Sequence, residues 1–151
     1  MKKPGPRIRV FIDTSVLIAG VASVTGASAT VLDLCEAESI QMVISRQVLV
    51  EADRNLSAKL PRLVTQFRQF IKDLAPIMVE DPPAVAVERA AALIDRKDAA
   101  ILAAAVEATV DYLITLDKKH FLKQKVQRSI PIEVCTPAEF LRIFERLWLE
   151  D

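Results

Sequence analysis

Short runs of consecutive apolar residues, separated by longer amphipathic segments, constrain the fold of this chain more than any other feature. Residues 9–12 contain Val10, Phe11 and Ile12 in succession, and similar runs lie at 41–44, 112–116 and 132–135. Unbroken apolar runs of this length are typical of strands buried on both faces of a parallel sheet. The pattern therefore predicts an α/β domain in which crossover helices cover both faces of a mainly parallel sheet.

The segments between these runs carry apolar residues at helical spacing. The clearest helix start is Thr136-Pro137-Ala138-Glu139, a capping-box pattern with proline at the first helical position. The run at 77–79 is too short to assign. Helices are predicted over 28–38, from Ser45 as N-cap toward Pro61, over 63–74, around 87–94, over 98–108, and from 137 along the stripe of Phe140, Phe144 and Leu147.

Length and composition point to one domain spanning residues 1–151. No apolar run approaches the roughly 20 residues of a membrane span, and the basic N-terminus lacks the apolar centre of a signal peptide. We therefore expect a soluble, cytoplasmic protein without a membrane partner. Cys35 and Cys135 lie far apart among apolar neighbours, so we expect two buried thiols.

The charges balance, with 20 basic and 20 acidic residues, so the whole molecule offers no field that would attract nucleic acid. A local patch is available at 118–128, where Lys118, Lys119, Lys123, Lys125 and Arg128 occur without an acidic residue. A solvated loop or helix face explains this segment equally well. The only histidine, His120, lies within it, and we interpret His120 as a surface residue.

Two acidic residues directly follow predicted strands. Asp13 comes after the run 9–12, and Asp117 closes the run 112–116. Ligands of open parallel sheets gather beyond the carboxyl ends of the strands, and a carboxylate there is costly to bury unless it is paired, capped or bound to a metal. The simpler interpretation is that Asp13 caps a helix and Asp117 caps a turn.

Two more acids lie on predicted helices. Glu51 is at the edge of the stripe formed by Val48 and Ala52, although an exposed glutamate is the commoner case. Asp98 falls in the first turn or at the N-cap of its helix, where the helix dipole alone would favour a carboxylate. Each signal is weak when it is taken alone.

Together the acids follow a family pattern. The chain resembles the PIN domain, including the VapC-type toxins, from Val10 to about Leu147. The resemblance rests on Phe11-Ile12-Asp13-Thr14-Ser15-Val16-Leu17-Ile18, on Glu51 after the second strand, on Lys97-Asp98-Ala99-Ala100-Ile101-Leu102, and on Tyr112-Leu113-Ile114-Thr115-Leu116-Asp117-Lys118-Lys119-His120-Phe121. The first and last stretches are the most specific.

The resemblance implies a three-layer α/β/α sandwich and an endoribonuclease that uses one or two Mg²⁺ or Mn²⁺ ions. Asp13, Glu51, Asp98 and Asp117 match the four acidic positions of its pocket, while Ser15 and Thr115 match supporting positions. Hard carboxylate oxygens suit Mg²⁺ and Mn²⁺ independently of the family. The resemblance also implies an RNA substrate, a cognate antitoxin and a homodimer, and Lys118 and Lys119 are candidates for phosphate contacts.

Other functions remain open at this stage. A haloacid-dehalogenase-like phosphotransferase would need an aspartate where this chain has Ser15, which disfavours it. A catalytically silent domain could keep the fold and bind RNA or protein, although acids at all four positions argue against it. The nuclease could equally be a toxin or a stand-alone RNA-processing enzyme.

Overall fold

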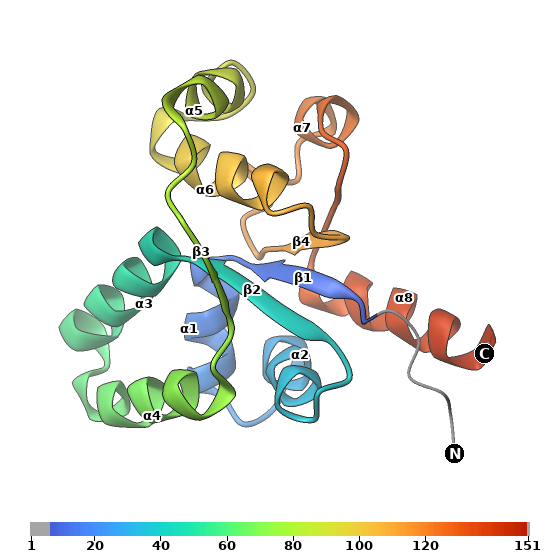
Figure 1. Ribbon diagram of the computed structural model, residues 1–151. Coiled ribbons are helices and arrows are strands. Elements are labelled where there is room, and N and C mark those ends of the chain that lie inside the picture. Colours follow the sequence, from blue (N-terminus) through green and yellow to red (C-terminus); the bar gives the residue numbers. More distant parts are fainter. Residues whose placement is uncertain (1–6, 151) are drawn as a thin grey trace.

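Five parallel strands form the sheet in the computed structural model, which describes residues 7–150. Their order across the sheet is β3-β2-β1-β4-β5 (Figure 1). The strands are β1 (Arg9–Ile12), β2 (Gln41–Ser45), β3 (Ile77–Val79), β4 (Tyr112–Ile114) and β5 (Glu133–Cys135). The short run at 77–79, which the sequence left unassigned, is the edge strand β3.

Strand β1 occupies the centre of the sheet because its side chains are apolar on both faces. Val10, Phe11 and Ile12 are fully buried, and β1 pairs with β2 on one side and with β4 on the other. Burial on both faces needs helices above and below the sheet. The predicted parallel sheet is thus confirmed, and its strands are parallel throughout the described residues.

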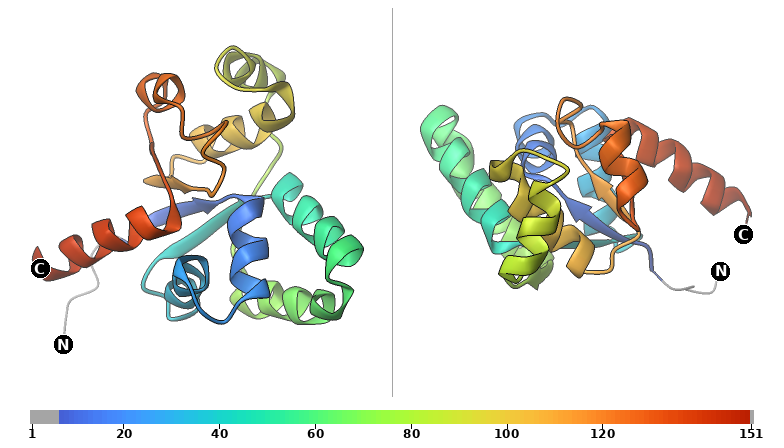
Figure 2. Two further views of the ribbon diagram at one scale, coloured as in Figure 1. Left: turned by 180° about the vertical axis from the view of Figure 1, so that it is seen from behind. Right: turned by 90° about the horizontal axis from the view of Figure 1, so that it is seen from above.

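Helices cover both faces and complete the predicted three-layer sandwich (Figures 1 and 2). One face carries α1 to α4 and α8, and the other carries α5 to α7. The helices are α1 (Thr14–Ala22), α2 (Ala27–Glu36), α3 (Arg46–Lys59), α4 (Val64–Leu74), α5 (Ala84–Ala91), α6 (Arg96–Glu107), α7 (Gln124–Ser129) and α8 (Pro137–Glu150), with a 3₁₀ turn at Pro61–Leu63.

Two predicted caps are present. The Ser45 hydroxyl accepts a hydrogen bond from the Val48 amide at 3.3 Å and starts α3. At the start of α8 the capping box is reciprocal, because the Thr136 amide donates to Glu139 Oε1 at 2.8 Å while the Glu139 amide donates to Thr136 Oγ1 at 3.1 Å. These local bonds fix where both helices begin.

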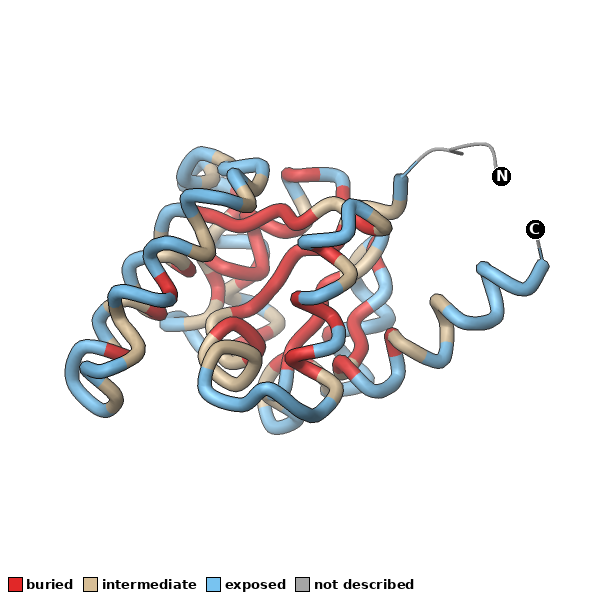
Figure 3. Tube along the Cα trace, turned by 90° about the horizontal axis from the view of Figure 1, so that it is seen from below, coloured by how far each residue is buried: buried red, intermediate tan, exposed pale blue. Residues whose placement is uncertain are grey.

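The core lies between the layers (Figure 3). It includes both cysteines, whose thiols are free and buried, and burial raises the pKa of each to about 12. The predicted apolar stripe on α8 is only partly buried: Phe140 is fully buried, but Leu147 is exposed where α8 extends beyond the body of the molecule.

Within the described residues no one helix has the length and hydropathy of a membrane span; α1 and α2 meet that criterion only as a pair bent by 94°.

The order of the strands positions the candidate site. The chain leaves β1 toward α1 on one face, whereas it leaves β4 toward α7 on the other face. In open α/β sheets, ligands commonly bind beyond the carboxyl ends of neighbouring strands whose connections diverge in this way. Because Ile12 pairs with Ile114, the residues that follow them meet at this edge of the sheet.

Candidate functional site

Asp13 directly follows the carboxyl end of β1 and is only 5% exposed. It occupies the N-cap position of α1, yet its side chain makes no capping hydrogen bond. Instead its Oδ2 accepts hydrogen bonds from Ser15 Oγ and Thr115 Oγ1, both at 2.8 Å. Capping therefore does not explain the carboxylate of Asp13.

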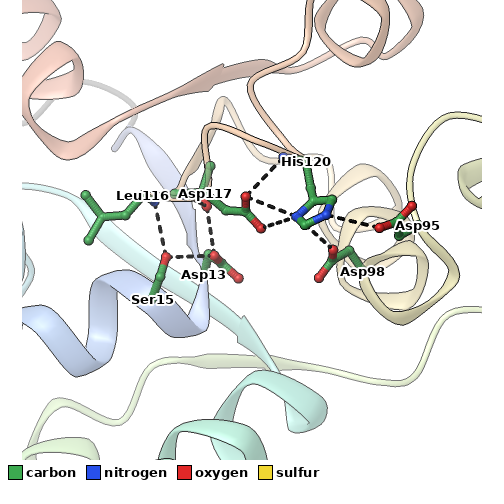
Figure 4. A network of polar contacts seen from close by, with 8 residues as sticks. Asp13, Ser15, Asp95, Asp98, Leu116, Asp117 and His120 are labelled. Atoms are coloured by element: carbon green, nitrogen blue, oxygen red, sulfur yellow. Dashed lines mark hydrogen bonds and ion pairs between the residues drawn. The ribbon is translucent and has the colours of Figure 1, made fainter.

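The hydroxyls of Ser15 and Thr115 connect Asp13 to the loop that follows β4. Ser15 Oγ accepts a hydrogen bond from the Leu116 amide at 3.1 Å, and Thr115 Oγ1 accepts one from the Asp117 amide at 3.0 Å (Figure 4). A single oxygen of Asp13 is thus connected through two side chains to two consecutive amides of the loop after β4. This network fixes the loop against the start of α1 and positions Asp117.

The strand β4 ends at Ile114, two residues earlier than the predicted run 112–116. The amide of Thr115 still donates to the Cys135 carbonyl oxygen at 3.0 Å, but the next two amides turn to the bridging hydroxyls. The predicted run 112–116 is therefore two residues too long for the strand, and Thr115 instead accepts a hydrogen bond from the Asp117 backbone.

Asp98 lies in the first turn of α6, near Asp117 and Asp13. Its side chain is 14% exposed, and its Oδ2 is buried without a hydrogen-bond partner among the described residues. A buried carboxylate oxygen without a partner costs free energy, so a helix dipole alone is a poor explanation for it. An oxygen of this kind is suited to a cation.

The pKa values show that three of the four predicted acids affect one another. Burial raises the pKa of Asp13 and the charge of Asp117 adds to the increase, although hydrogen bonds from Thr115 and Ser15 oppose it. Burial also raises the pKa of Asp98, which the charges of Asp117 and Asp13 raise further. Asp13, Asp98 and Asp117 thus form one acidic cluster, defined here by these three residues.

Asp117 differs from the other two because both the amide and the ring of His120 contact its carboxylate within hydrogen-bond distance. Burial would raise its pKa, but hydrogen bonds from the side chain and amide of His120 outweigh that effect and leave the pKa below its usual value. The His120 amide donates to Asp117 Oδ1 at 3.0 Å, as in a capped turn. Asp117 therefore has the turn role that the simpler interpretation assigned to it, and it also faces the cluster (Figure 4).

Glu51 contacts the first residue of α1. Its Oε2 accepts a hydrogen bond from Thr14 Oγ1 and its Oε1 accepts one from Gln47, both at 3.2 Å. Thr14 directly follows Asp13, so α3 brings Glu51 to the start of α1. Glu51 is partly buried rather than the freely exposed glutamate of the commoner interpretation.

His120 is the residue that sequence reasoning missed. Its side chain is only 15% exposed, whereas a surface position was expected. Nδ1 lies 2.9 Å from Asp117 Oδ2 and 3.7 Å from Asp98 Oδ2, and Nε2 lies 3.0 Å from Asp95 Oδ2 (Figure 4). Its position three residues after Asp117 was the available signal, because that spacing returns the ring to the same carboxylate.

The donors fit a divalent cation. One ligand atom from each of Asp98, Asp117 and His120 can be chosen so that all three lie within 4.8 Å of one another. Asp98, whose Oδ2 has no hydrogen-bond partner among the described residues, belongs to this group. Lys118 and Lys119, the predicted phosphate contacts, directly follow Asp117 and are exposed.

Comparisons with known proteins bear on this arrangement. The PIN domain family model matches residues 9–119. A comparison with curated protein sequences gives no match. Among solved structures, PAE2754 from Pyrobaculum aerophilum is 18% identical, with a TM-score of 0.61 over 92% of this chain and 90% of that one.

Two further structures have the same fold. VapBC2 from Rickettsia felis, solved bound to a DNA fragment from its promoter, is 16% identical, with a TM-score of 0.58 over 85% of this chain and 98% of that one. VapC20 from Mycobacterium tuberculosis, described as a Sarcin-Ricin loop cleaving toxin, is also 16% identical, with a TM-score of 0.56 over 73% of this chain and 91% of that one. The family match covers most of the chain and includes the whole acidic cluster, so this chain belongs to the PIN domain family.

Proposed function

We propose that the chain is a Mg²⁺- or Mn²⁺-dependent endoribonuclease and the toxin component of a toxin–antitoxin pair. The observation that carries the nuclease proposal is the acidic cluster, in particular Asp98 Oδ2, which is buried without a hydrogen-bond partner beside Asp117. Carboxylates held this close to one another would repel a phosphodiester. They become useful to its hydrolysis only when cations neutralise them.

The residues of the chain would share the work as follows. Asp13 and Asp117 would hold cations directly, and Asp98 directly or through water. One or two bound ions would supply a water nucleophile at neutral pH and neutralise the charge that develops on the phosphate. Glu51, held by Thr14 and Gln47, would orient or deprotonate the attacking water.

Ser15 and Thr115 would act through Asp13. Each donates to Asp13 Oδ2, so that oxygen has a fixed position before any cation arrives. Preorganised ligands lower the cost of ordering when the substrate binds. Lys118 and Lys119 would contact RNA phosphates beside the cluster and would position the strand without reading its sequence.

A cleavage assay tests the nuclease proposal. The wild-type chain should cleave RNA with Mg²⁺ or Mn²⁺ and should stop on chelation, while Asp13→Asn, Asp98→Asn and Asp117→Asn should each lose about 100-fold or more in rate, as expected when several kcal/mol of charge stabilisation disappear. Glu145→Gln, an exposed carboxylate change on α8, is the matched control. Near wild-type activity of Asp13→Asn would remove that residue from the mechanism.

The similarity in fold to VapC20 and VapBC2 supports the toxin assignment. A groove lined by Ala86, Ala90, Leu93, Val106 and Ile130 offers an apolar surface to an antitoxin segment. When the chain is expressed in bacteria, growth should stop and specific RNAs should be cleaved. The product of a neighbouring gene should bind the chain and restore growth. Cleavage without toxicity or a neighbouring antitoxin would instead indicate a stand-alone RNA-processing enzyme. A homodimer and a cytoplasmic location remain predictions.

A further inference from the structure

His120 is placed by the loop so that its two ring nitrogens face different carboxylates. Nδ1 faces inward to Asp117 and Asp98, at 2.9 Å and 3.7 Å from their Oδ2 atoms. Nε2 faces Asp95, whose Oδ2 lies 3.0 Å away and whose side chain is 63% exposed. The ring thus lies between Asp95 on one side and Asp98 and Asp117 on the other (Figure 4).

This geometry resembles the way proteins prepare a histidine to bind a metal. A metal-binding histidine commonly donates its second ring nitrogen to a carboxylate, which fixes the tautomer and the orientation of the ring. Asp95 occupies that position on Nε2. The nitrogen left for a cation is then Nδ1, and it already lies among the oxygens of Asp98 and Asp117.

Two further observations separate His120 from a histidine that only fills space. It is held at both ends, because its amide donates to Asp117 Oδ1 at 3.0 Å while its ring contacts Asp117 Oδ2. In addition, Asp98 Oδ2 has no hydrogen-bond partner among the described residues, since the 3.7 Å to Nδ1 exceeds hydrogen-bond length. A bound cation would give Asp98 Oδ2 a partner, and on Nδ1 it would take the place of the proton in the contact with Asp117 Oδ2.

The identity of the donors predicts the identity of the cation. Mg²⁺ takes oxygen ligands and keeps several waters, whereas imidazole nitrogen is a ligand for first-row transition ions. A cluster of carboxylates alone would accept Mg²⁺ and Mn²⁺ with little distinction. A nitrogen among those oxygens shifts the preference toward the transition ion.

We propose that His120 supplies Nδ1 to the metal site, that Asp95 orients its ring through Nε2, and that this pair makes the site selective for Mn²⁺ over Mg²⁺. The inference rests on the proposed function, because it concerns the cation of that same acidic cluster. It goes further by adding two residues to the four acids and by choosing between the two ions.

Pulsed electron paramagnetic resonance of bound Mn²⁺ tests the ligand directly, since a coordinated imidazole adds a nitrogen modulation to the signal. His120 is the only histidine in the sequence, so in an untagged chain a histidine nitrogen can be assigned to it without ambiguity. The wild-type chain should show the modulation, and His120→Asn should lose it. Asparagine can still donate a hydrogen bond toward Asp117, so this variant keeps the structural contact and removes the nitrogen ligand.

Calorimetric titration with each ion alone measures the selectivity. His120→Asn should weaken Mn²⁺ binding about 10- to 100-fold and Mg²⁺ binding much less, and Asp95→Asn should weaken Mn²⁺ binding about 10-fold, as for other carboxylates that orient a metal-binding histidine. Glu145→Gln should change neither affinity. Melting of each variant without metal shows whether it is folded.

The outcomes separate this inference from the proposed function. In one outcome the wild-type chain binds Mn²⁺ tightly and needs Asp117 to do so, but its spectrum shows no nitrogen modulation and His120→Asn has an unchanged ratio of Mn²⁺ to Mg²⁺ affinity. That outcome would overturn the role of His120 and leave the nuclease proposal intact. If the wild-type chain binds neither ion, or binds them unchanged in Asp117→Asn, both proposals fail. The wild-type spectrum decides the question even if a variant does not fold.

Discussion

Replacing Thr115 by valine tests how the acidic cluster is held together. Thr115 is fully buried, and valine has nearly the same shape, so the change removes a hydroxyl without opening a cavity. Two hydrogen bonds are lost: the one donated to Asp13 Oδ2 at 2.8 Å and the one accepted from the Asp117 amide at 3.0 Å. The substitution therefore isolates the polar contribution of this bridge.

The expected loss follows from the two bonds. A hydrogen bond to a charged group contributes about 1.5–3 kcal/mol and a neutral one about 1 kcal/mol, so Thr115→Val should lower the free energy of unfolding by about 2.5–4 kcal/mol. At about 2–4 °C per kcal/mol for a domain of this size, the melting temperature should fall by about 5–16 °C. Differential scanning calorimetry of the metal-free chain measures both.

The loss should also depend on pH. The pKa of Asp13 is already raised, chiefly by burial, so the native state binds its proton more tightly than the unfolded state and stability falls as pH rises above the unfolded value of 3.8. Thr115→Val removes a bond that favours the ionised form and raises this pKa further. The difference in stability between wild type and variant should therefore widen as pH rises through the raised pKa that Asp13 has in the native wild-type chain.

Two controls make this prediction sharp. Thr65→Val, at an exposed position of α4, should change the melting temperature by no more than a degree or two. In an Asp13→Asn background the cost of Thr115→Val should fall to about half, because a neutral acceptor forms the weaker bond. A loss below about 0.5 kcal/mol, or one that is the same at all pH values, would refute the reasoning.

Three further predictions follow from the site and the core. Asp13→Asn should raise the melting temperature of the metal-free chain, because it removes a buried charge. Mn²⁺ at 100 times its Kd should raise the melting temperature of the wild-type chain by about 5–11 °C and that of Asp13→Asn not at all. An equal increase in the variant would contradict a metal site at Asp13. Replacing both Lys118 and Lys119 with alanine should reduce the slope of log affinity for single-stranded RNA against log salt by about 1.4, and an unchanged slope would reject their contact with phosphate. Cys35 and Cys135, whose thiol pKa values burial raises to about 12, should react with a thiol reagent only on unfolding, and immediate labelling of the native chain would show that they are accessible.

The sheet could be predicted from the sequence because its central strands are buried on both faces. In a chain with helical segments between them, unbroken apolar runs such as Val10-Phe11-Ile12 are typical of buried parallel strands. The edge strand β3 could not be assigned from the sequence because it is not buried on both faces. Ile77 and Met78 are exposed, and the strand pairs with β2 alone among the described residues. The caps at Ser45 and Thr136 were predictable because their bonds reach only three residues along the chain.

Contacts between distant parts of the chain were less accessible. The bridge from Asp13 through Thr115 spans 102 residues, and no local pattern states that one carboxylate oxygen would receive two hydroxyls. The inward position of His120 depends on Asp95, which belongs to another helix start, and on a loop that departs from the strand at Ile114. In both cases the sequence gives the chemical character of each side chain, but it does not indicate which distant residue that side chain contacts.

A crystal soaked in Mn²⁺ and measured at the manganese absorption edge tests most directly whether the acids form one cation site. We expect an anomalous difference peak enclosed by the carboxylates of Asp13, Asp98 and Asp117, and we expect it to vanish from crystals of Asp13→Asn. Manganese bound only elsewhere on the molecule, or a peak of equal height in Asp13→Asn, would contradict the account.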